Sequence, residues 1–377
     1  MLDRINIASA APQGAASQQT QPVVTLRSLA TATPPHRLAQ GDVRDASRAL
    51  FADRMPFFSR LEPVFDNAEI EHRYSCQPLE WFMQPADFKE KSRLYVEHAT
   101  ALAEDAARRA LDAAAMEADE IDLILFVSST GIATPSIDAR LLNRIPFRSN
   151  VMRLPVFGYG CAGGVLGLSR AAQMARTSPG LNVLLIVVEL CSLAFRLDRL
   201  TKSNLVACAL FGDGAAAAVI SSGADAGGAA CTIGARGEHC WPDTLNVMGW
   251  DVDAGGLDVI FHQSIPDIVA RDYPVVVDRF LADCGLTRAT AGRPCCHPGG
   301  AKVITELEHV FGLPATGLTS ERRVLRDFGN MSAPTVLFVL DDLLRSGARG
   351  PMLLTALGPG FTAAFQCIDV AAQGARP

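Results

Sequence analysis

Three consecutive stretches decide the fold: IDLILFVSST (121–130), RLPVFGYGCAGGVLGLSRAAQMART (153–177) and LNVLLIVVEL (181–190). The first and third are continuous apolar runs, which are typical of strands buried on both faces of a sheet. The middle stretch passes from a glycine-rich turn into a helix that begins near Cys161. A strand, a helix and a strand at this spacing predict a layered α/β fold.

The same alternation extends through the first half of the chain. Residues 23–29 predict a first strand, residues 87–114 a long helix with few breakers, and residues 135–145 a shorter helix. Residues 211–223 place glycines before an apolar run. This order predicts a close approach of the backbone, followed by the last strand of this half.

The second half repeats the alternation. Apolar residues at steps of three and four predict a helix over 264–285, and RPCCHPGG (293–300) is expected to follow a strand. A long buried helix is expected over 330–347. Two apolar runs joined by Gly-Pro-Gly predict a hairpin within 351–370.

The two halves are both mixed α/β and similar in size, which indicates a duplicated architecture divided into 23–230 and 231–377. They follow a stretch over 1–22 that is rich in Ala, Gln and Ser and has no apolar core, so we expect a flexible extension rather than a signal peptide. The apolar runs are all much shorter than the about 20 residues needed to cross a bilayer. These features predict a cytoplasmic protein without a membrane span.

The composition excludes several classes of protein. The chain has 377 residues, of which 49% are hydrophobic and 20% charged, so it is neither low-complexity nor disordered as a whole. Lys and Arg number 34 against 40 Asp and Glu, and the basic residues are scattered. The charge pattern of a nucleic-acid binder is therefore absent, and an anionic ligand must be held by a local pocket.

The ten cysteines do not form the dense pattern of a small secreted scaffold. No pair has C-x-x-C spacing, and Cys295, Cys296 and His297 cannot surround a tetrahedral ion without further ligands. We therefore expect no metal site. The question is which cysteine is reactive.

Cys161 has the most favourable surroundings for a nucleophile. Small residues surround it in GYGCAGG (158–164), so a substrate carbonyl could approach closely, and the start of a helix stabilises a thiolate. A structural cysteine in a glycine-rich turn is the competing interpretation.

Two other residues could complete a reactive site with Cys161. His297 lies on an expected loop, where it could take a proton from a thiol or donate to an oxyanion, or simply be satisfied by the backbone. Asn330 precedes an apolar helix, where it could cap that helix or donate a hydrogen bond to a thioester oxygen without adding charge. The three residues arrive in three separate glycine-rich segments.

Five short segments together resemble the type III polyketide synthases, the chalcone and stilbene synthase family of the thiolase superfamily. They are FGYGCAGG (157–164), ALFGDGAAA (209–217), CCHPGG (295–300), GNMSAPTV (329–336) and GPG (358–360). The resemblance runs from about residue 23 to 370. It implies the five-layered αβαβα thiolase fold with two related halves, a homodimer, and acyl-CoA substrates.

The resemblance also implies roles for individual residues. The nucleophile of the family falls on Cys161, and its catalytic His and Asn fall on His297 and Asn330. The two phenylalanines that flank the entrance to the family's active site fall on Phe211 and Phe261, although packing in the core is the simpler explanation for each.

Departures from the plant pattern bear on the substrate. ELCSLA (189–194) resembles the stretch whose threonines line the starter pocket, but here Cys191 and Ala194 replace them. Thr130 falls where the family has a small hydroxyl residue. Val252 falls where chalcone synthases use a glycine, which would narrow the starter pocket for an aromatic starter. Smaller, less polar walls resemble the bacterial members that accept long fatty acyl-CoA starters and make alkylpyrones or alkylresorcinols.

Two further residues complete the expected site. Ser332, two residues after Asn330, is expected to contact substrate. Arg73 lies in the region where coenzyme A phosphates could be held, but a surface arginine without that role is the simpler interpretation.

The implied reaction is repeated decarboxylative condensation of malonyl-CoA onto a starter acyl group on Cys161, followed by ring closure. Loss of CO2 drives it, so we expect no metal, flavin or nicotinamide cofactor. Two alternatives remain open from the sequence: a ketoacyl-ACP synthase III, which condenses once with a carrier protein, and a non-catalytic acyl-binding protein of the same fold.

Overall fold

The central feature of the fold is one large mixed sheet. The computed structural model describes residues 22–223 and 231–371, so the extension expected over 1–22 falls almost entirely outside it. Within these ranges nine strands form the sheet in the order β11-β12-β13-β8-β1-β7-β6-β4-β5. Their bounds are β1 Val24–Ala32, β4 Leu123–Val127, β5 Met152–Val156, β6 Asn182–Leu190, β7 Asp213–Ser222, β8 Cys231–Cys240, β11 Arg293–Cys296, β12 Gly350–Gly358 and β13 Thr362–Val370.

The strands of the two halves of the chain meet at a single seam in this sheet. β1 pairs with β7 over most of its length, whereas it pairs with β8 at one position, Thr25 with Thr232. The strands on either side of the seam therefore behave as two sheets that touch along one edge.

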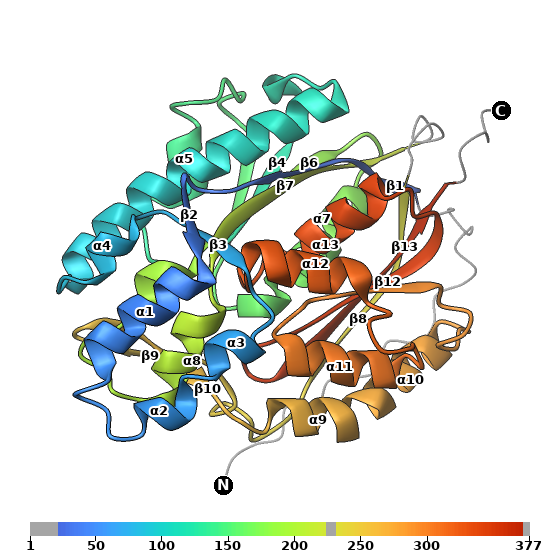
Figure 1. Cartoon of the computed structure of the whole chain (residues 1–377). Helices are drawn as coiled ribbons and strands as arrows, with labels where there is room; N and C mark the ends of the chain where they lie inside the picture. Colours follow the sequence, from blue (N-terminus) through green and yellow to red (C-terminus); the bar gives the residue numbers. More distant parts are fainter. Residues whose placement is uncertain (1–21, 224–230, 372–377) are drawn as a thin grey trace, which may run out of the picture.

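Helices cover both faces of the two sheets (Figure 1). α5 (Phe88–Ala114) packs on the outer face of the first sheet, and α9 (Ile265–Arg271), α10 (Tyr273–Asp283) and α11 (Ala301–Val310) pack on the outer face of the second. α7 (Gly163–Arg176) and α13 (Thr335–Arg345) fill the layer between the sheets. The layers therefore follow the order αβαβα, which confirms the fold expected from the sequence.

The alternation of side chains along each strand explains why the first sheet is buried on both faces. In β4, Leu123, Leu125 and Val127 pack against the central helices, while Ile124 and Phe126 pack against α5. Successive side chains of a strand point to opposite faces, so a strand between two helical layers must be apolar at every position. Burial on both faces therefore explains the continuous apolar run from which this strand was predicted.

The long helix α5 begins and ends where local chemistry dictates. Its N-cap Asp87 accepts a hydrogen bond from the Glu90 backbone N–H at 2.7 Å. At the other end Ala115 adopts a left-handed conformation with φ of 50°, which terminates the helix. Alanines at 99, 103, 106, 107 and 110 are fully buried, so the helix lies close against the sheet.

A smaller lobe lies beside the layers, at the left of Figure 1. It contains α1 (Gln40–Phe51), α2 (Phe58–Leu61), α3 (Val64–Asn67), α4 (Leu79–Phe82), α8 (Lys202–Leu210), the ribbon of β2 (His36–Ala39) and β3 (His72–Ser75), and the hairpin of β9 (Met248–Asp253) and β10 (Gly256–Phe261). The sequence patterns did not predict most of this lobe, which has an apolar cluster of its own around Phe51, Phe58 and Phe65.

The remaining elements correct three expectations. Residues 264–285 form two helices, α9 and α10, rather than one, because the chain turns at Asp272 and Pro274. RPCC is itself the strand β11 and does not follow one. The helix expected over 330–347 begins at Thr335 after Pro334, so Asn330 does not cap it; α12 (Thr319–Phe328) precedes it.

Two short helices complete the description: α6 (Ile137–Leu141) and the 3₁₀ turn η1 (Ala118–Glu120). No helix within the described ranges is both long enough and apolar enough to span a bilayer.

Candidate active site

A cavity at the junction of the two halves brings together residues from distant parts of the chain. It encloses about 430 Å³ and is lined by Cys161, His297, Asn330 and Phe261, together with Met248, Ile265, Tyr273, Gly299, Val303, Leu307, Thr355, Ala356 and Leu357. We call it the Cys161 cavity. Four residues singled out in the sequence thus meet at one place, although 169 positions separate Cys161 from Asn330.

Cys161 sits in the 3₁₀ turn η2 (Gly160–Ala162), directly before α7. The expected position at the start of a helix is therefore confirmed. Gly164 in the first turn of α7 is needed there, because a Cβ on it would lie 2.3 Å from the Ala333 carbonyl oxygen. The missing side chain lets the segment that carries Asn330 pack against the helix that carries Cys161.

The thiol of Cys161 is strongly shielded from water. Only 8% of the residue is exposed, and this burial raises the pKa of the thiol to about 11. Hydrogen bonds from Ser332 and Asn330 act in the opposite direction, so Ser332 also lies beside the sulfur. The group is a thiol at neutral pH unless a base takes its proton.

Behind Cys161 lies a buried carboxyl group, Glu189. It accepts hydrogen bonds from the Ser129 backbone N–H at 2.9 Å and the Thr130 hydroxyl at 2.7 Å. Burial raises the pKa of Glu189 to about 8, so the carboxyl is largely protonated at neutral pH. A negative charge here would raise the pKa of Cys161 further.

His297 is held by its backbone while its ring stays free. The His297 N–H donates to the Thr355 carbonyl at 2.8 Å, which continues the pairing of β11 with β12. Neither ring nitrogen has a hydrogen-bond partner among the described residues. Burial lowers the pKa of the imidazole to about 3, so the free ring is neutral and can accept a proton or donate a hydrogen bond to a ligand.

Asn330 is fixed on both sides by backbone hydrogen bonds. Its N–H donates to the Leu210 carbonyl at 2.8 Å, and its carbonyl accepts from Gly212 at 3.0 Å. The side-chain amide donates to the Gly299 carbonyl at 3.1 Å. An amide nitrogen carries two hydrogens, so the second donor is the one directed at the Cys161 sulfur.

The FGDG segment (211–214) connects this cavity to the smaller lobe. Gly212 allows close packing, since a Cβ on it would lie 2.5 Å from the Phe328 carbonyl oxygen. The Asp213 carboxylate accepts from the backbone of Cys76 and Ser192, both at 2.8 Å. Asp213 therefore ties β3 to the turn η3 (Cys191–Ala194).

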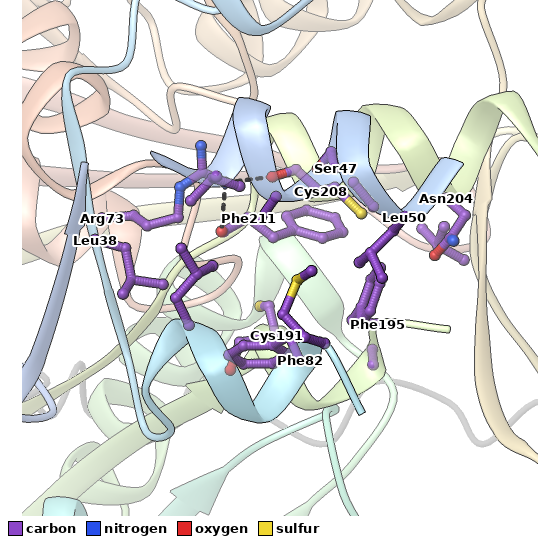
Figure 2. Close-up of a pocket in the computed structure, with 18 of the residues that line it drawn as sticks. Leu38, Ser47, Leu50, Arg73, Phe82, Cys191, Phe195, Asn204, Cys208 and Phe211 are labelled. Carbon is purple, nitrogen blue, oxygen red and sulfur yellow. Dashed lines mark hydrogen bonds between the residues drawn. The ribbon is translucent and has the colours of Figure 1, made fainter. Parts of the chain in front are cut away.

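A second, larger cavity is lined by Phe211 (Figure 2). It encloses about 680 Å³, and we call it the apolar cavity. Its walls are Leu38, Val43, Ala46, Ser47, Leu50, Arg73, Leu79, Phe82, Met83, Cys191, Ser192, Ala194, Phe195, Asn204, Ala207, Cys208, Phe211, Trp250 and Val259. Three residues expected to bind substrate, Cys191, Ala194 and Phe211, thus line one space.

One face of the β9–β10 hairpin covers both cavities. Trp250 pairs with Val259 over the apolar cavity, and Met248 pairs with Phe261 over the Cys161 cavity. These pairs are two residues apart along the strands, so all four side chains point to the same side. The two cavities are therefore neighbours under a common cover.

Arg73 is buried, which corrects the expectation of a surface arginine. Its guanidinium donates to the carbonyls of Cys208 at 2.6 Å and Ala209 at 2.8 Å, the last turn of α8, and to Phe211 at 3.1 Å (Figure 2). Burial lowers the pKa of this guanidinium to about 10. A cation at the C-terminus of a helix is stabilised by the helix dipole, so Arg73 fixes α8 and Phe211 rather than binding at the surface.

Two other residues lie outside both cavities. Thr130 lines a separate small cavity with Tyr95, Leu193 and Leu257, and the backbone N–H of Leu190 donates to its hydroxyl at 2.8 Å. Val252 is 56% exposed on β9, so the expectation that it narrows the starter pocket is wrong.

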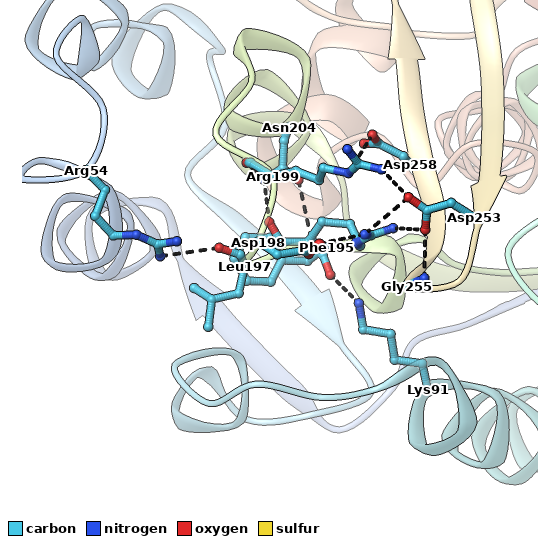
Figure 3. Close-up of polar contacts among 11 residues, drawn as sticks. Arg54, Lys91, Phe195, Leu197, Asp198, Arg199, Asn204, Asp253, Gly255 and Asp258 are labelled. Carbon is cyan, nitrogen blue, oxygen red and sulfur yellow. Dashed lines mark hydrogen bonds and ion pairs between the residues drawn. The ribbon is translucent and has the colours of Figure 1, made fainter.

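An ion-pair cluster fixes the hairpin to the wall of the apolar cavity (Figure 3). Asp253 at the hairpin turn pairs with Arg196 at 2.7 Å and with Arg199, while Arg196 also pairs with Asp198 at 2.7 Å. These arginines hold the pKa of Asp253 well below its usual range. Arg199 pairs with Asp258 of β10 at 3.2 Å, so both strands of the hairpin are attached.

Sequence reasoning missed most walls of the apolar cavity. Val43, Ser47 and Leu50 follow the spacing of one face of α1, and that periodicity could have revealed them. Trp250 and Val259 carried no such pattern, because their role depends on how the hairpin folds back. Among the described residues, no group of three or more His, Cys, Asp or Glu side chains is arranged to hold a metal ion.

Comparisons with known proteins match this arrangement over nearly the whole chain. Residues 12–225 match the domain described as chalcone and stilbene synthases, N-terminal domain, and residues 235–366 match the corresponding C-terminal domain. A 1,3,6,8-tetrahydroxynaphthalene synthase from Streptomyces peucetius subsp. caesius is 40% identical over 342 residues, which are 89% of this chain and 90% of that protein.

A more distant relative and a solved structure agree with that match. An alpha-pyrone synthesis polyketide synthase-like protein, Pks18, from Mycobacterium tuberculosis is 28% identical over 92% of this chain and 91% of that protein. The crystal structure of 1,3,6,8-tetrahydroxynaphthalene synthase from Streptomyces coelicolor A3(2), described as a bacterial type III polyketide synthase, has a TM-score of 0.86 and 25% identity. It covers 92% of this chain and 99% of that structure.

Proposed function

This chain belongs to the chalcone and stilbene synthase family of type III polyketide synthases, and we propose that it extends a long-chain fatty acyl-CoA starter with malonyl-CoA. We propose further that it closes the product to an alkylpyrone or alkylresorcinol. The apolar cavity carries this proposal. It lies next to the Cys161 cavity, and nearly all of its walls are apolar.

The walls of the apolar cavity suit an alkyl chain for a physical reason. Leu38, Val43, Leu50 and Met83 offer no hydrogen-bond donors or acceptors to a ligand, and Cys191 and Ala194 continue this surface. An alkyl chain needs no such partners and gains from leaving water, whereas a polyhydroxylated chain would lose hydrogen bonds there.

We propose that Cys161 carries the growing chain. The His297 imidazole takes the proton of the Cys161 thiol, and the sulfur attacks the starter thioester carbonyl. The C–S bond to coenzyme A breaks, and coenzyme A leaves as a thiol after receiving a proton. The acyl group is then a thioester of Cys161, with its alkyl chain in the apolar cavity.

Extension follows from decarboxylation of malonyl-CoA beside this thioester. The bond between the α-carbon and the carboxylate breaks, CO2 leaves, and the electron pair forms an enolate whose oxygen accepts hydrogen bonds from His297 and Asn330. The enolate carbon attacks the Cys161 thioester, which releases the thiolate and lengthens the chain by two carbons. Loss of CO2 drives the step, so the proposal includes no metal, flavin or nicotinamide cofactor.

Three other residues are proposed to shape the space around the reacting atoms. Phe261 lines the Cys161 cavity, Phe211 lines the apolar cavity, and Ser332 lies beside the sulfur. Their contribution is to hold the chain near Cys161 and to limit how the finished polyketide can fold for ring closure.

A second candidate is the formation of a tetrahydroxynaphthalene. The relative that is 40% identical to this chain is named for that product, which has no alkyl side chain. In this case the starter would be small and the apolar cavity would hold part of the extended chain.

One experiment separates the candidates. Purified protein is incubated with malonyl-CoA alone and with starters from acetyl-CoA to stearoyl-CoA, and the products are identified by mass spectrometry. We expect pyrones or resorcinols that carry the starter chain, with the best yield from long chains. Tetrahydroxynaphthalene from malonyl-CoA alone would favour the second candidate, and a single condensation that requires a malonyl carrier protein would contradict both.

We also propose that the protein forms a homodimer through the free edge of β5. This strand ends the sheet, and Met152 and Leu154 are exposed on one of its faces beside Phe157, which is 57% exposed. An uncovered edge with apolar side chains is stable in water only when another strand or surface covers it. Light scattering should give twice the chain mass, and Leu154→Lys should shift it toward the monomer.

A cytoplasmic location also remains a proposal. All ten cysteines lie in the described part of the chain and none forms a disulfide there, which suits a reducing compartment.

A further inference from the structure

A surface groove lies directly behind one wall of the apolar cavity. It encloses about 990 Å³ between α4, the start of α5, the segment after η3 and the turn of the β9–β10 hairpin. Its walls are Arg54, Trp81, Phe82, Gln84, Pro85, Ala86, Asp87, Phe88, Lys91, Phe195, Leu197, Asp198, Ala254 and Gly255. We call it the α4 groove.

Only two side chains are common to the α4 groove and the apolar cavity. They are Phe82 and Phe195, whose ring centroids lie 6.1 Å apart with an interplanar angle of 76°. Both rings are half-buried, and both line the apolar cavity, as Figure 2 shows, as well as the α4 groove. The Phe82–Phe195 pair is therefore the wall that the apolar cavity and the α4 groove have in common.

The two rings are held very differently. Phe195 packs edge-on against Phe51 with centroids 6.1 Å apart, and its carbonyl accepts a hydrogen bond from Lys91 of α5 (Figure 3). The next residue, Arg196, is anchored by the ion-pair cluster of the hairpin. The Phe195 side of the pair is thus fixed by its surroundings.

Phe82 has no comparable support. It is the last residue of α4, a helix of four residues of which none is buried. Within residues 22–223 and 231–371, Trp81 at 5.0 Å is its one aromatic neighbour besides Phe195. Local opening needs least free energy where few apolar contacts must be broken. Phe82 is therefore the movable member of the pair.

From this arrangement we propose that Phe82 and Phe195 form a gate between the apolar cavity and the α4 groove, and that the methyl end of a long starter chain passes through it. Chains that end inside the cavity leave the gate closed, and longer chains displace Phe82 and lie along the groove. Phe82 is then a residue that determines starter length. This inference rests on the proposed use of acyl-CoA starters.

The lining of the groove fits an alkyl tail better than a charged one. Trp81, Phe88 and Leu197 provide an apolar surface continuous with the gate. Lys91 donates to the Phe195 carbonyl and Arg54 donates to the Leu197 carbonyl, so both side chains support the wall. Asp87 and Asp198 add two carboxylates to the lining, and their charge disfavours a terminal carboxylate in the groove.

The first test measures kcat/KM for straight-chain starters from hexanoyl-CoA to stearoyl-CoA. Phe82→Ala should raise the ratio of kcat/KM for stearoyl-CoA to kcat/KM for hexanoyl-CoA by at least about tenfold, the discrimination that even one methylene contributes in an apolar site. Leu50→Ala, which enlarges the cavity without touching the gate, and Phe88→Ala, which changes the groove alone, are the matched controls. If kcat/KM depended on starter length in the same way for Phe82→Ala and Leu50→Ala, the proposal of a gate would be wrong.

A second test does not depend on turnover. Acyl-CoA thioesters with a diazirine at the chain end are bound to the wild-type protein and to Cys161→Ala, irradiated, and the labelled residues are mapped by mass spectrometry. Short chains should label the cavity walls around Leu50 and Cys208, and long chains should label residues 84–91 or Leu197. Long chains that label only cavity walls, or another surface, would contradict the proposal.

The two tests also separate this inference from the proposed function. If no starter gives a polyketide while long chains still label the α4 groove, the proposed reaction is wrong and the proposed gate is supported. If long starters give polyketides with the same length profile in Phe82→Ala and never label the groove, the reaction stands and the gate is wrong.

Discussion

The Cys161 cavity and the apolar cavity share a boundary but are built in opposite ways. The first takes its key residues from strand ends and turns of the layered core, where backbone hydrogen bonds fix His297 and Asn330. The second takes its walls from the short helices of the smaller lobe and from one hairpin. Catalysis and starter selection are therefore assigned to different parts of the molecule. The core fixes the reacting groups, and the lobe can vary to select the starter.

The sharpest test of this division replaces a cysteine in each cavity. Cys161→Ala should reduce product formation by at least about ten-thousandfold, because the nucleophile that carries the chain is lost. The matched variant Cys191→Ala removes the same group from the apolar cavity and should keep most activity while it changes starter preference. Incorporation of labelled malonyl-CoA into products measures both.

The division would be wrong if the two variants lost activity equally. It would also be wrong if Cys161→Ala still formed polyketides, because the chain would then be carried elsewhere.

The next largest effect is expected at His297. His297→Gln should lower kcat by about a hundredfold to a thousandfold, since one preorganised donor to the developing oxyanion is lost. It also removes the base that receives the Cys161 proton. Burial raises the pKa of Cys161 to about 11, so alkylation of the variant by iodoacetamide should be slow at neutral pH and increase steadily up to about pH 10.

The wild-type protein is the control for this pH profile. An identical alkylation profile in the wild type and in His297→Gln would show that His297 does not take the proton.

A smaller effect is expected from Glu189, the carboxyl group behind Cys161, on how the free energy of unfolding depends on pH. Burial raises the pKa of Glu189 to about 8 from an ordinary value of 4.5. Between these values the folded protein holds a proton that the unfolded chain has released, so the free energy of unfolding falls as pH rises. The side chain in Glu189→Gln cannot ionise, so the decrease in the free energy of unfolding over this pH range should be smaller by an amount on the order of a few kcal/mol.

Urea unfolding at several pH values between about 5 and 9 measures this effect. The exposed pair Arg93 and Glu97 offers a control, since Glu97→Gln should leave the slope unchanged. A slope in Glu189→Gln as steep as in the wild type would mean that Glu189 is ionised in the folded protein.

The smallest effect is expected at the wall of the apolar cavity. Ala194→Thr adds bulk and a hydroxyl to the wall of the apolar cavity, so kcat/KM for long acyl-CoA starters should fall by about tenfold. Activity with acetyl-CoA should be unchanged. An equal loss for short and long starters would show that Ala194 affects the Cys161 cavity and that the two cavities are not separable.

The layered core could be predicted from the sequence, and the smaller lobe could not. β4, β6 and α5 carry periodic or continuous apolar patterns that follow from burial on one or both faces. The four-residue helices α2, α3 and α4 are too short to show a period, so their form depends on the packing around them. The strands β9 and β10 are half-exposed and mix apolar with charged residues, which hides their alternation.

The candidate site shows the same limit. Glycine-rich segments pointed to Cys161, His297 and Asn330, and the fold brings all three to one cavity. No sequence pattern indicates that the hydroxyl of Thr130 donates to Glu189, nor that Arg73 is buried at the end of α8. Both outcomes depend on contacts between residues more than 50 positions apart, which local patterns do not record.

The position of β1 in the sheet affects how the chain can fold as it is synthesised. β1 is the first described element, yet its partners are β7, where Val24 pairs with Ser222, and β8. At the usual speed of a ribosome, roughly 10 to 40 seconds pass between the synthesis of the two members of that pair. During this interval the apolar faces of β4 and β6 lack a neighbour on one side, so the nascent first half is a natural client for a chaperone.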